Sequence, residues 1–127
     1  MQELQNIGTL GDKSYAFALR IIDAYKFLIT QCNEYVLSKQ LLRSGTSIGA
    51  NCRESRNAQS KLDFVNKLNI ALKEADETAY WLELLKDAQY INQKTFDSIY
   101  QDCVELIKLL TAIIKTTKKN LEKQQGV

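Results

Sequence analysis

The chain has 127 residues and a net charge of +2, so it is expected to form one domain, and its charge alone does not indicate nucleic-acid binding. Its hydrophobic fraction of 45% is ordinary for a soluble protein, and no apolar run approaches the roughly 20 residues that span a membrane. Proline is absent and glycines number only 5, which predicts an almost entirely helical chain.

Residues 1–11 lack a sustained helical repeat, and we expect them to form a partly ordered lead-in. Asp12 or Ser14 can cap a first helix that ends near Cys32, because both side chains accept hydrogen bonds from free backbone N–H groups. The apolar stripe of this helix comprises Ala18, Ile21, Ile22, Tyr25, Leu28, Ile29 and Cys32. A second apolar face, made of Phe17, Ala24 and Phe27, indicates a further partner beyond the bundle interior.

The second helix, predicted from a cap at Ser38 to about Arg56, has an unusual composition for a helix. It contains Gly45 and Gly49 among serines and alanine, although each glycine costs roughly 1 kcal/mol relative to alanine. A helix selected only for its own stability would not carry them. We therefore expect another helix to pack closely against this one.

The remaining sequence predicts two longer helices. The third runs from Lys61 to about Ala88, after a capping box of Ser60 and Asp63. The fourth runs from Gln93, after Asn92 as its cap, to about Leu121, and residues 123–127 are expected to form a flexible tail. Short connections make successive helices antiparallel neighbours, so residues 12–122 are predicted to form an all-α, up-down-up-down four-helix bundle.

Acidic residues on several helices raise the question of a di-iron site. Such a site normally requires Glu-x-x-His motifs, and the chain contains no His. We expect no metal, no cofactor and no small-molecule substrate. The serines and cysteines also lack a His base, so no catalytic residue is assigned and an enzyme is the least favoured class.

The same acidic residues have structural interpretations. Glu74 and Glu77 can pair with Arg43, pair with a partner subunit, or face water. Asn51 and Glu54 complete a set that we interpret as a structural polar network or an interface. The three cysteines are an odd number without a CxxC pattern, which predicts buried, reduced thiols in a cytoplasmic protein.

Two basic clusters are predicted to share one end of the bundle, because the second and fourth helices end at the same pole. The first cluster is Arg53, Arg56 and Lys61, and the second is Lys115, Lys118, Lys119 and Lys123. Solvation and the helix dipole can explain them, and contact with the phosphates of RNA or DNA is the functional alternative. No aromatic residues interleave with these cations, so we expect any such binding to be sequence-independent and salt-sensitive.

Apolar residues exceed what one bundle interior can bury. Tyr80 and Trp81, with Leu84 and Leu85, predict an oligomer or partner surface on the third helix. Self-association as a closed ring or an isologous dimer is the simplest outcome. A protein-interaction scaffold without a nucleic-acid role is the alternative function.

The motif on the second helix resembles the signature of a known family, the 23S rRNA intervening-sequence proteins, also called bacterial four-helix-bundle proteins. The matching residues are Leu37, Ser38, Gln40, Leu41, Arg43, Ser44, Ser47, Ile48, Asn51 and Glu54. A second matching block on the third helix comprises Phe64, Leu68, Ile70, Ala71, Glu74, Glu77, Thr78, Trp81 and Leu82. The resemblance covers roughly residues 12–120. Two positions depart from it. The family often has Gly at the position of Ser55 and usually has Ile or Val at the position of Cys52.

The resemblance implies a four-helix bundle that assembles as a ring-shaped homopentamer in the bacterial cytoplasm. It implies a poorly defined biochemical role, with some members encoded inside insertions of rRNA genes. A related accessory protein of diversity-generating retroelements is similar in fold and binds nucleic acid through a basic surface. These implications favour a non-enzymatic oligomer that contacts RNA or DNA.

Overall fold

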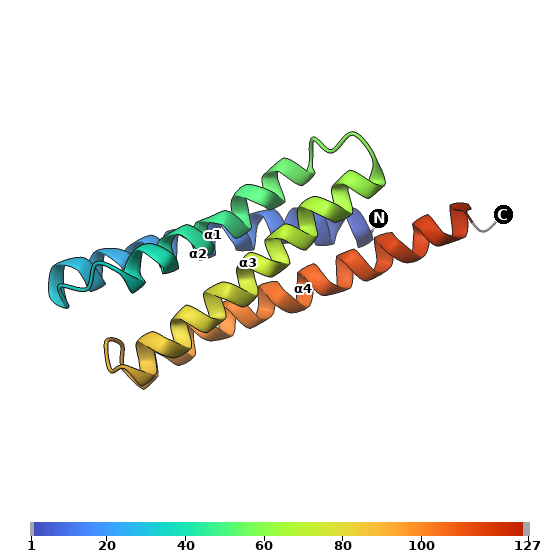
Figure 1. The fold of residues 1–127 in the computed structure, drawn as a ribbon. Coiled ribbons are helices and arrows are strands. Elements are labelled where there is room, and N and C mark those ends of the chain that lie inside the picture. The colour runs from blue at the N-terminus through green and yellow to red at the C-terminus, as the bar shows by residue number, and fades with distance from the viewer. Residues whose placement is uncertain (1, 126–127) are drawn as a thin grey trace.

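The computed structural model describes residues 2–125, so Met1 and the last part of the predicted tail, residues 126–127, lie outside the described residues. Helices α1 (Gln2–Gln31), α2 (Leu37–Ser55), α3 (Lys61–Asp87) and α4 (Gln93–Gln125) make up the fold, and the described residues contain no strand. Successive helices run in opposite directions along one bundle (Figure 1). The predicted all-α, up-down-up-down architecture is confirmed.

The bundle closes around a single apolar core to which all four helices contribute. Helix α1 packs against α2 and α4, and α3 packs against the same two helices, with the smallest contact between α1 and α4. The largest side chains that are fully enclosed include Phe17, Ile21, Leu41, Ile48, Leu68, Leu82, Leu106 and Leu110. Helical spacing places these residues on one face of each helix, so most of them could be identified from the sequence. Phe17 is a correction, because the sequence assigned it to a second face for a further partner and its side chain is only 2% exposed in the core.

Helix α1 begins at Gln2, well before the predicted start near Asp12. Leu10 explains the difference, because its side chain is only 1% exposed and belongs to the core cluster. Burial of this side chain favours a helical segment that its glycines, Gly8 and Gly11, disfavour. At the other end of the chain, α4 continues past Leu121 to Gln125.

Helix α2 is not capped by Ser38, contrary to the sequence-based prediction. The side chain of Glu34 accepts hydrogen bonds from the backbone N–H groups of Val36, Leu37 and Ser38, at 3.2, 3.0 and 2.7 Å. Burial would raise the pKa of this carboxyl group, but these N–H groups and the Ser38 hydroxyl lower the pKa below its ordinary value. A carboxylate one turn earlier in the chain therefore holds the first turn of α2.

The predicted caps of α3 and α4 are confirmed. The Ser60 side chain accepts a hydrogen bond from the Asp63 backbone N–H at 3.0 Å. The Asn92 side chain accepts one from the Thr95 N–H at 2.8 Å. These bonds satisfy backbone donors that have no partner inside the helix, so both helices begin where the sequence predicts.

The glycines of α2 permit the close helix contact that the sequence predicts. A Cβ atom added to Gly45 would lie 2.7 Å from Cγ1 of Ile21 on α1. A Cβ atom added to Gly49 would lie 3.3 Å from the backbone oxygen of Ser14. Only glycine therefore fits at Gly45 without movement of α1 or of the Ile21 side chain.

Candidate nucleic-acid interface

The exposed cations that the sequence singles out gather toward one end of the bundle, and we call them the basic pole. The basic pole comprises Arg53, Arg56, Lys61, Lys115, Lys118 and Lys119, all of which are exposed. They lie at the end of α2, the start of α3 and the last part of α4, which Figure 1 shows at the same end of the molecule. Within the described part of the chain, none of them forms an ion pair with a carboxylate.

The arginines of the basic pole lie against α1, and this brings an aromatic residue to them. The guanidinium carbon of Arg53 is 5.9 Å from the centre of the Tyr15 ring. The guanidinium of Arg56 occupies the space directly over Gly11, where an added Cβ atom would collide with it. Tyr15 was not predicted to be near any cation, because it is far from the arginines in sequence and no spacing rule links the two.

The lysines of α4 are separate from this arginine site. None of them lines the hollows that Arg53 and Arg56 border, and no hydrogen bond among the described residues joins them to the arginines. The structure thus brings Arg53 and Arg56 together and leaves Lys115, Lys118 and Lys119 as independent exposed charges on the last part of α4.

Arg43 forms the centre of a polar network between α2 and α3. Its guanidinium donates to Glu74 at 3.1 Å, to Glu77 and to the Gln40 side chain at 3.2 Å. The hydrogen bond with Glu77 is the main reason that the pKa of Arg43 is raised. Of the pairings that the sequence left open, the one within the chain is present.

The other two members of the predicted network lie apart from Arg43. Asn51 donates to the backbone oxygen of Ser47 at 2.9 Å. Glu54 pairs with Lys67 at 3.6 Å. Both contacts involve α2 or its junction with α3, so they support local packing rather than one continuous network.

The predicted surface on α3 is only partly exposed. Tyr80 is 55% exposed, and its ring centre lies 5.1 Å from that of the half-buried Trp81 in an edge-on arrangement. The indole Nε1 of Trp81 is buried and has no hydrogen-bond partner among the described residues. Leu85 is fully buried and belongs to the core, not to this surface.

Cys52 and Cys103 are buried as predicted and are poor candidates for chemistry, whereas Cys32 is only half-buried. Burial raises the pKa of Cys52 to about 11 and that of Cys103 to about 12. Both thiols therefore stay protonated, and the reactive thiolate is scarce at neutral pH. Among the described residues no group of His, Cys, Asp and Glu side chains is arranged to hold a metal ion.

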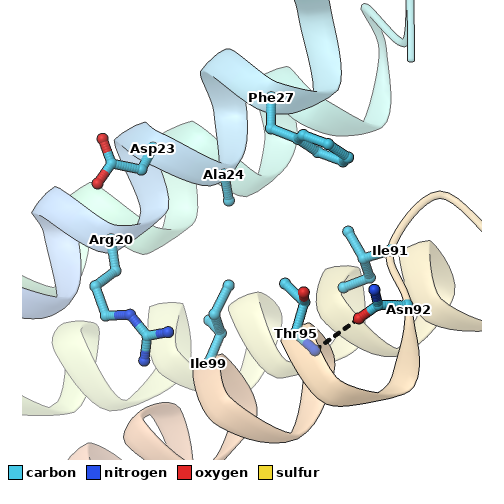
Figure 2. A pocket seen from close by; sticks show the side chains of 8 residues that line it. All are labelled: Arg20, Asp23, Ala24, Phe27, Ile91, Asn92, Thr95 and Ile99. Atoms are coloured by element: carbon cyan, nitrogen blue, oxygen red, sulfur yellow. Dashed lines mark hydrogen bonds between the residues drawn. The ribbon is translucent and has the colours of Figure 1, made fainter. Parts of the chain in front are cut away.

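A hollow of about 320 Å³ lies between α1 and the start of α4. Figure 2 shows Ala24 and Phe27 of α1 facing Ile91 and Ile99 across this gap, whereas the carboxylate of Asp23 points away from α4. Phe27 lines the hollow and is 46% exposed. Ala24 and Phe27 belong to the second apolar face that the sequence identified, although the sequence did not show that the face borders a hollow.

No described helix is both long and apolar enough to cross a membrane. The molecule is thus an antiparallel four-helix bundle with exposed cations at one end, an Arg43 network at the surface between α2 and α3, and an apolar hollow on one side.

The model of the 23S rRNA-intervening sequence protein family matches residues 10–112, and the chain belongs to this family. A solved structure is also similar, that of a protein with unknown function from the S23 ribosomal protein family of Bacteroides thetaiotaomicron VPI-5482. The two sequences are 57% identical, with a TM-score of 0.86, and the match covers 87% of this chain and 98% of that one. No curated protein matches the chain significantly.

Proposed function

We propose that this chain is a non-enzymatic homo-oligomer of the bacterial cytoplasm that contacts RNA or DNA through its basic pole. The observation that carries the proposal is the gathering of exposed cations without carboxylate partners among the described residues. Phosphate groups are the natural partners of such a surface, because binding releases the counterions condensed on the nucleic acid. The small net charge of +2 does not oppose this, since Glu54 and Asp12, which lie beside the arginines, form no ion pair with them among the described residues.

We further propose that the oligomer is a ring-shaped homopentamer. Family membership supports it, as do Tyr80 and the other large apolar side chains that a single chain leaves exposed. A ring with rotational symmetry would repeat the basic pole around its axis and strengthen a weak contact by multivalency. Analytical ultracentrifugation of the purified protein tests the subunit number directly, and a monomer would refute the ring.

Nucleic-acid contact is tested by fluorescence anisotropy with labelled RNA and DNA over a range of salt concentrations. The test variant replaces Lys115, Lys118 and Lys119 with Gln. The matched control replaces Lys26, Lys39 and Lys94 with Gln. These exposed lysines lie toward the opposite end of the bundle, and their replacement removes the same number of positive charges.

We expect the basic-pole variant to bind about tenfold or more weakly, with a salt dependence reduced by about one unit of slope for each phosphate-contacting lysine. The control should bind like the wild type. Absence of wild-type binding at low salt, or equal losses in both variants, would refute the basic pole as the contact surface.

A protein-interaction scaffold is the second candidate, and the apolar hollow at Phe27 and Ile91 favours it. Such a site would accept an apolar side chain of a partner protein. Pulldowns from native cytosol with and without nuclease separate the two functions. A partner that survives nuclease treatment and is lost on Phe27→Ser would support the scaffold.

A further inference from the structure

A groove runs along the outer surface of α1 and α2 and ends at the arginines of the basic pole. Its volume is about 480 Å³, within the range of ligand sites of about 300–1,000 Å³. Several small residues line it, and at Gly49 the two helices approach closely, because an added Cβ atom would lie 3.3 Å from the backbone oxygen of Ser14. The lining includes Gly11, Ala18, Gly49, Ala50, Arg53 and Arg56.

An exposed aromatic ring and two guanidinium groups meet at the end of this groove. Tyr15 is 57% exposed and lies under the guanidinium of Arg53. Arg56 lies over Gly11 and borders the same groove. Tyr15, Arg53 and Arg56 also line an adjacent hollow of about 410 Å³, so both hollows open at this cluster.

The acidic residues at the groove do not neutralise both arginines. Glu54 is directed to Lys67, with which it pairs at 3.6 Å. Asp12 lines the adjacent hollow but forms no ion pair with either arginine within the described residues. The cluster therefore places positive charge beside a tyrosine ring that is more than half exposed.

This combination matches the chemistry of an unpaired nucleotide. A base can stack on a tyrosine ring or on the plane of a guanidinium, while the phosphate beside it pairs with a second guanidinium. Bases inside a duplex are stacked on one another and cannot reach such a ring. An aromatic residue among the cations thus distinguishes this site from a surface that contacts only the phosphate backbone.

We propose that Tyr15, Arg53 and Arg56 form a subsite for one unpaired nucleotide, so that the protein prefers single-stranded nucleic acid to duplex. The proposal rests on the proposed nucleic-acid function and names its substrate class. Tyr15 stacks on the base, Arg53 covers the ring and the base edge, and Arg56 binds the adjacent phosphate.

The test compares three labelled probes by anisotropy at low salt. They are an oligothymidylate of about twelve nucleotides, an abasic strand of the same length, and a duplex of the same length. Tyr15→Leu removes the ring but keeps apolar bulk, and Tyr15→Phe keeps the ring. Tyr35→Leu is the matched control, because Tyr35 is 54% exposed but lies in the connection between α1 and α2, away from the arginines.

We expect the wild type to bind the oligothymidylate more tightly than either other probe. Tyr15→Leu should lower the affinity for oligothymidylate about tenfold and leave abasic-strand binding unchanged, because only stacking is lost. Tyr15→Phe and Tyr35→Leu should bind like the wild type.

A second variant tests the arginine without a change in charge. Gly11→Ala places a methyl group where the guanidinium of Arg56 lies, so this flexible side chain must move away. We expect weaker binding of both the oligothymidylate and the abasic strand, because the phosphate contact is lost. Gly8→Ala is its control, since an added Cβ atom at Gly8 meets nothing within 4 Å.

The outcomes separate this inference from the proposed function. If the wild type binds no probe, the proposed function fails and the subsite with it. If it binds single strand and duplex equally and Tyr15→Leu has no effect, the subsite is overturned while the basic pole stands. If Tyr15→Leu changes the sedimentation of the protein, Tyr15 belongs to a subunit interface and the subsite is overturned.

Discussion

Helix α1 packs against two neighbours in different ways. It contacts α2 through glycines, and at the solvent-facing edge of its contact with α4, here called the outer seam, it is joined by charged side chains. On the α2 side, Gly45 leaves space for Ile21, which is fully buried. On the α4 side, Arg20 bonds to Asp102 at 2.6 Å and to Ser98, and the side chains of Arg20 and Asp102 are about 40% exposed. Farther along the same seam the two helices separate around the hollow at Phe27.

The difference between the two sides identifies where the fold tolerates change. At the glycines, the backbone of α2 lies directly against α1, so added side-chain atoms would press against α1. Exposed ion pairs hold the outer α1–α4 seam, and such pairs contribute little because water and salt screen them. Ser14 and Gly49, where α1 approaches α2 closely, also line the proposed nucleotide groove.

The strongest test of the tight contact is Gly45→Val. The new side chain would overlap with Ile21, which is enclosed on all sides, so we expect the free energy of unfolding to fall by about 2–3 kcal/mol. Urea denaturation with an unchanged slope measures it. Gly8→Ala, where nothing lies within 4 Å, should instead be neutral or stabilising by up to about 1 kcal/mol. Equal stability of the two variants would contradict the contrast.

The junction of α1 with α2 should depend on pH through Glu34. Glu34→Gln keeps the shape of the side chain but removes the negative charge of the carboxylate, which accepts hydrogen bonds from three backbone N–H groups. We expect the free energy of unfolding to fall by about 1–2 kcal/mol at pH 7. Because the pKa of Glu34 is lowered on folding, its contribution is complete above its ordinary pKa of 4.5. The contribution then disappears as the pH falls through the lowered pKa.

Urea denaturation of the wild type and Glu34→Gln across this pH range measures the effect. The difference in the free energy of unfolding between the wild type and Glu34→Gln should become smaller in acid. Glu122→Gln, at an exposed position near the end of α4, serves as the control and should match the wild type at every pH. A difference between wild type and Glu34→Gln that stays constant in acid would show that the carboxylate charge is not responsible.

The sequence predicted the features that leave a recognisable pattern and missed those that leave none. The apolar spacing and the caps at Ser60 and Asn92 could be predicted because each acts within one helix or its first turn. The glycines of α2 could be interpreted because glycine is unfavourable inside a helix unless a neighbouring helix packs closely against it. Glu34 was missed because a buried carboxylate that caps the next helix leaves no distinctive spacing. Tyr15 was missed for a related reason, since only the packing of α1 on α2 brings it to Arg53.

The seam between α1 and α4 should respond far less than the glycine contact. A double-mutant cycle of Arg20→Ala and Asp102→Ala should give a coupling energy of about 0.5 kcal/mol, because both side chains are about 40% exposed. The coupling should approach zero at 1 M NaCl, where charges are screened within about 3 Å. Urea denaturation of the four proteins measures it. A coupling of about 2 kcal/mol that persists in salt would show that this seam is as tightly defined as the other.

The smallest effect is expected where a side chain grows into the hollow. Ala24→Leu adds volume on α1, as Gly45→Val does on α2, but its new atoms enter the space of about 320 Å³ beside Phe27 and Ile91. We expect unchanged stability or a gain of about 0.5 kcal/mol, because newly buried apolar atoms replace empty space. Urea denaturation beside Gly45→Val makes the two enlargements directly comparable. A loss as large as that of Gly45→Val would mean that α1 and α4 close over the hollow in solution, and the contrast between the two sides of α1 would then fail.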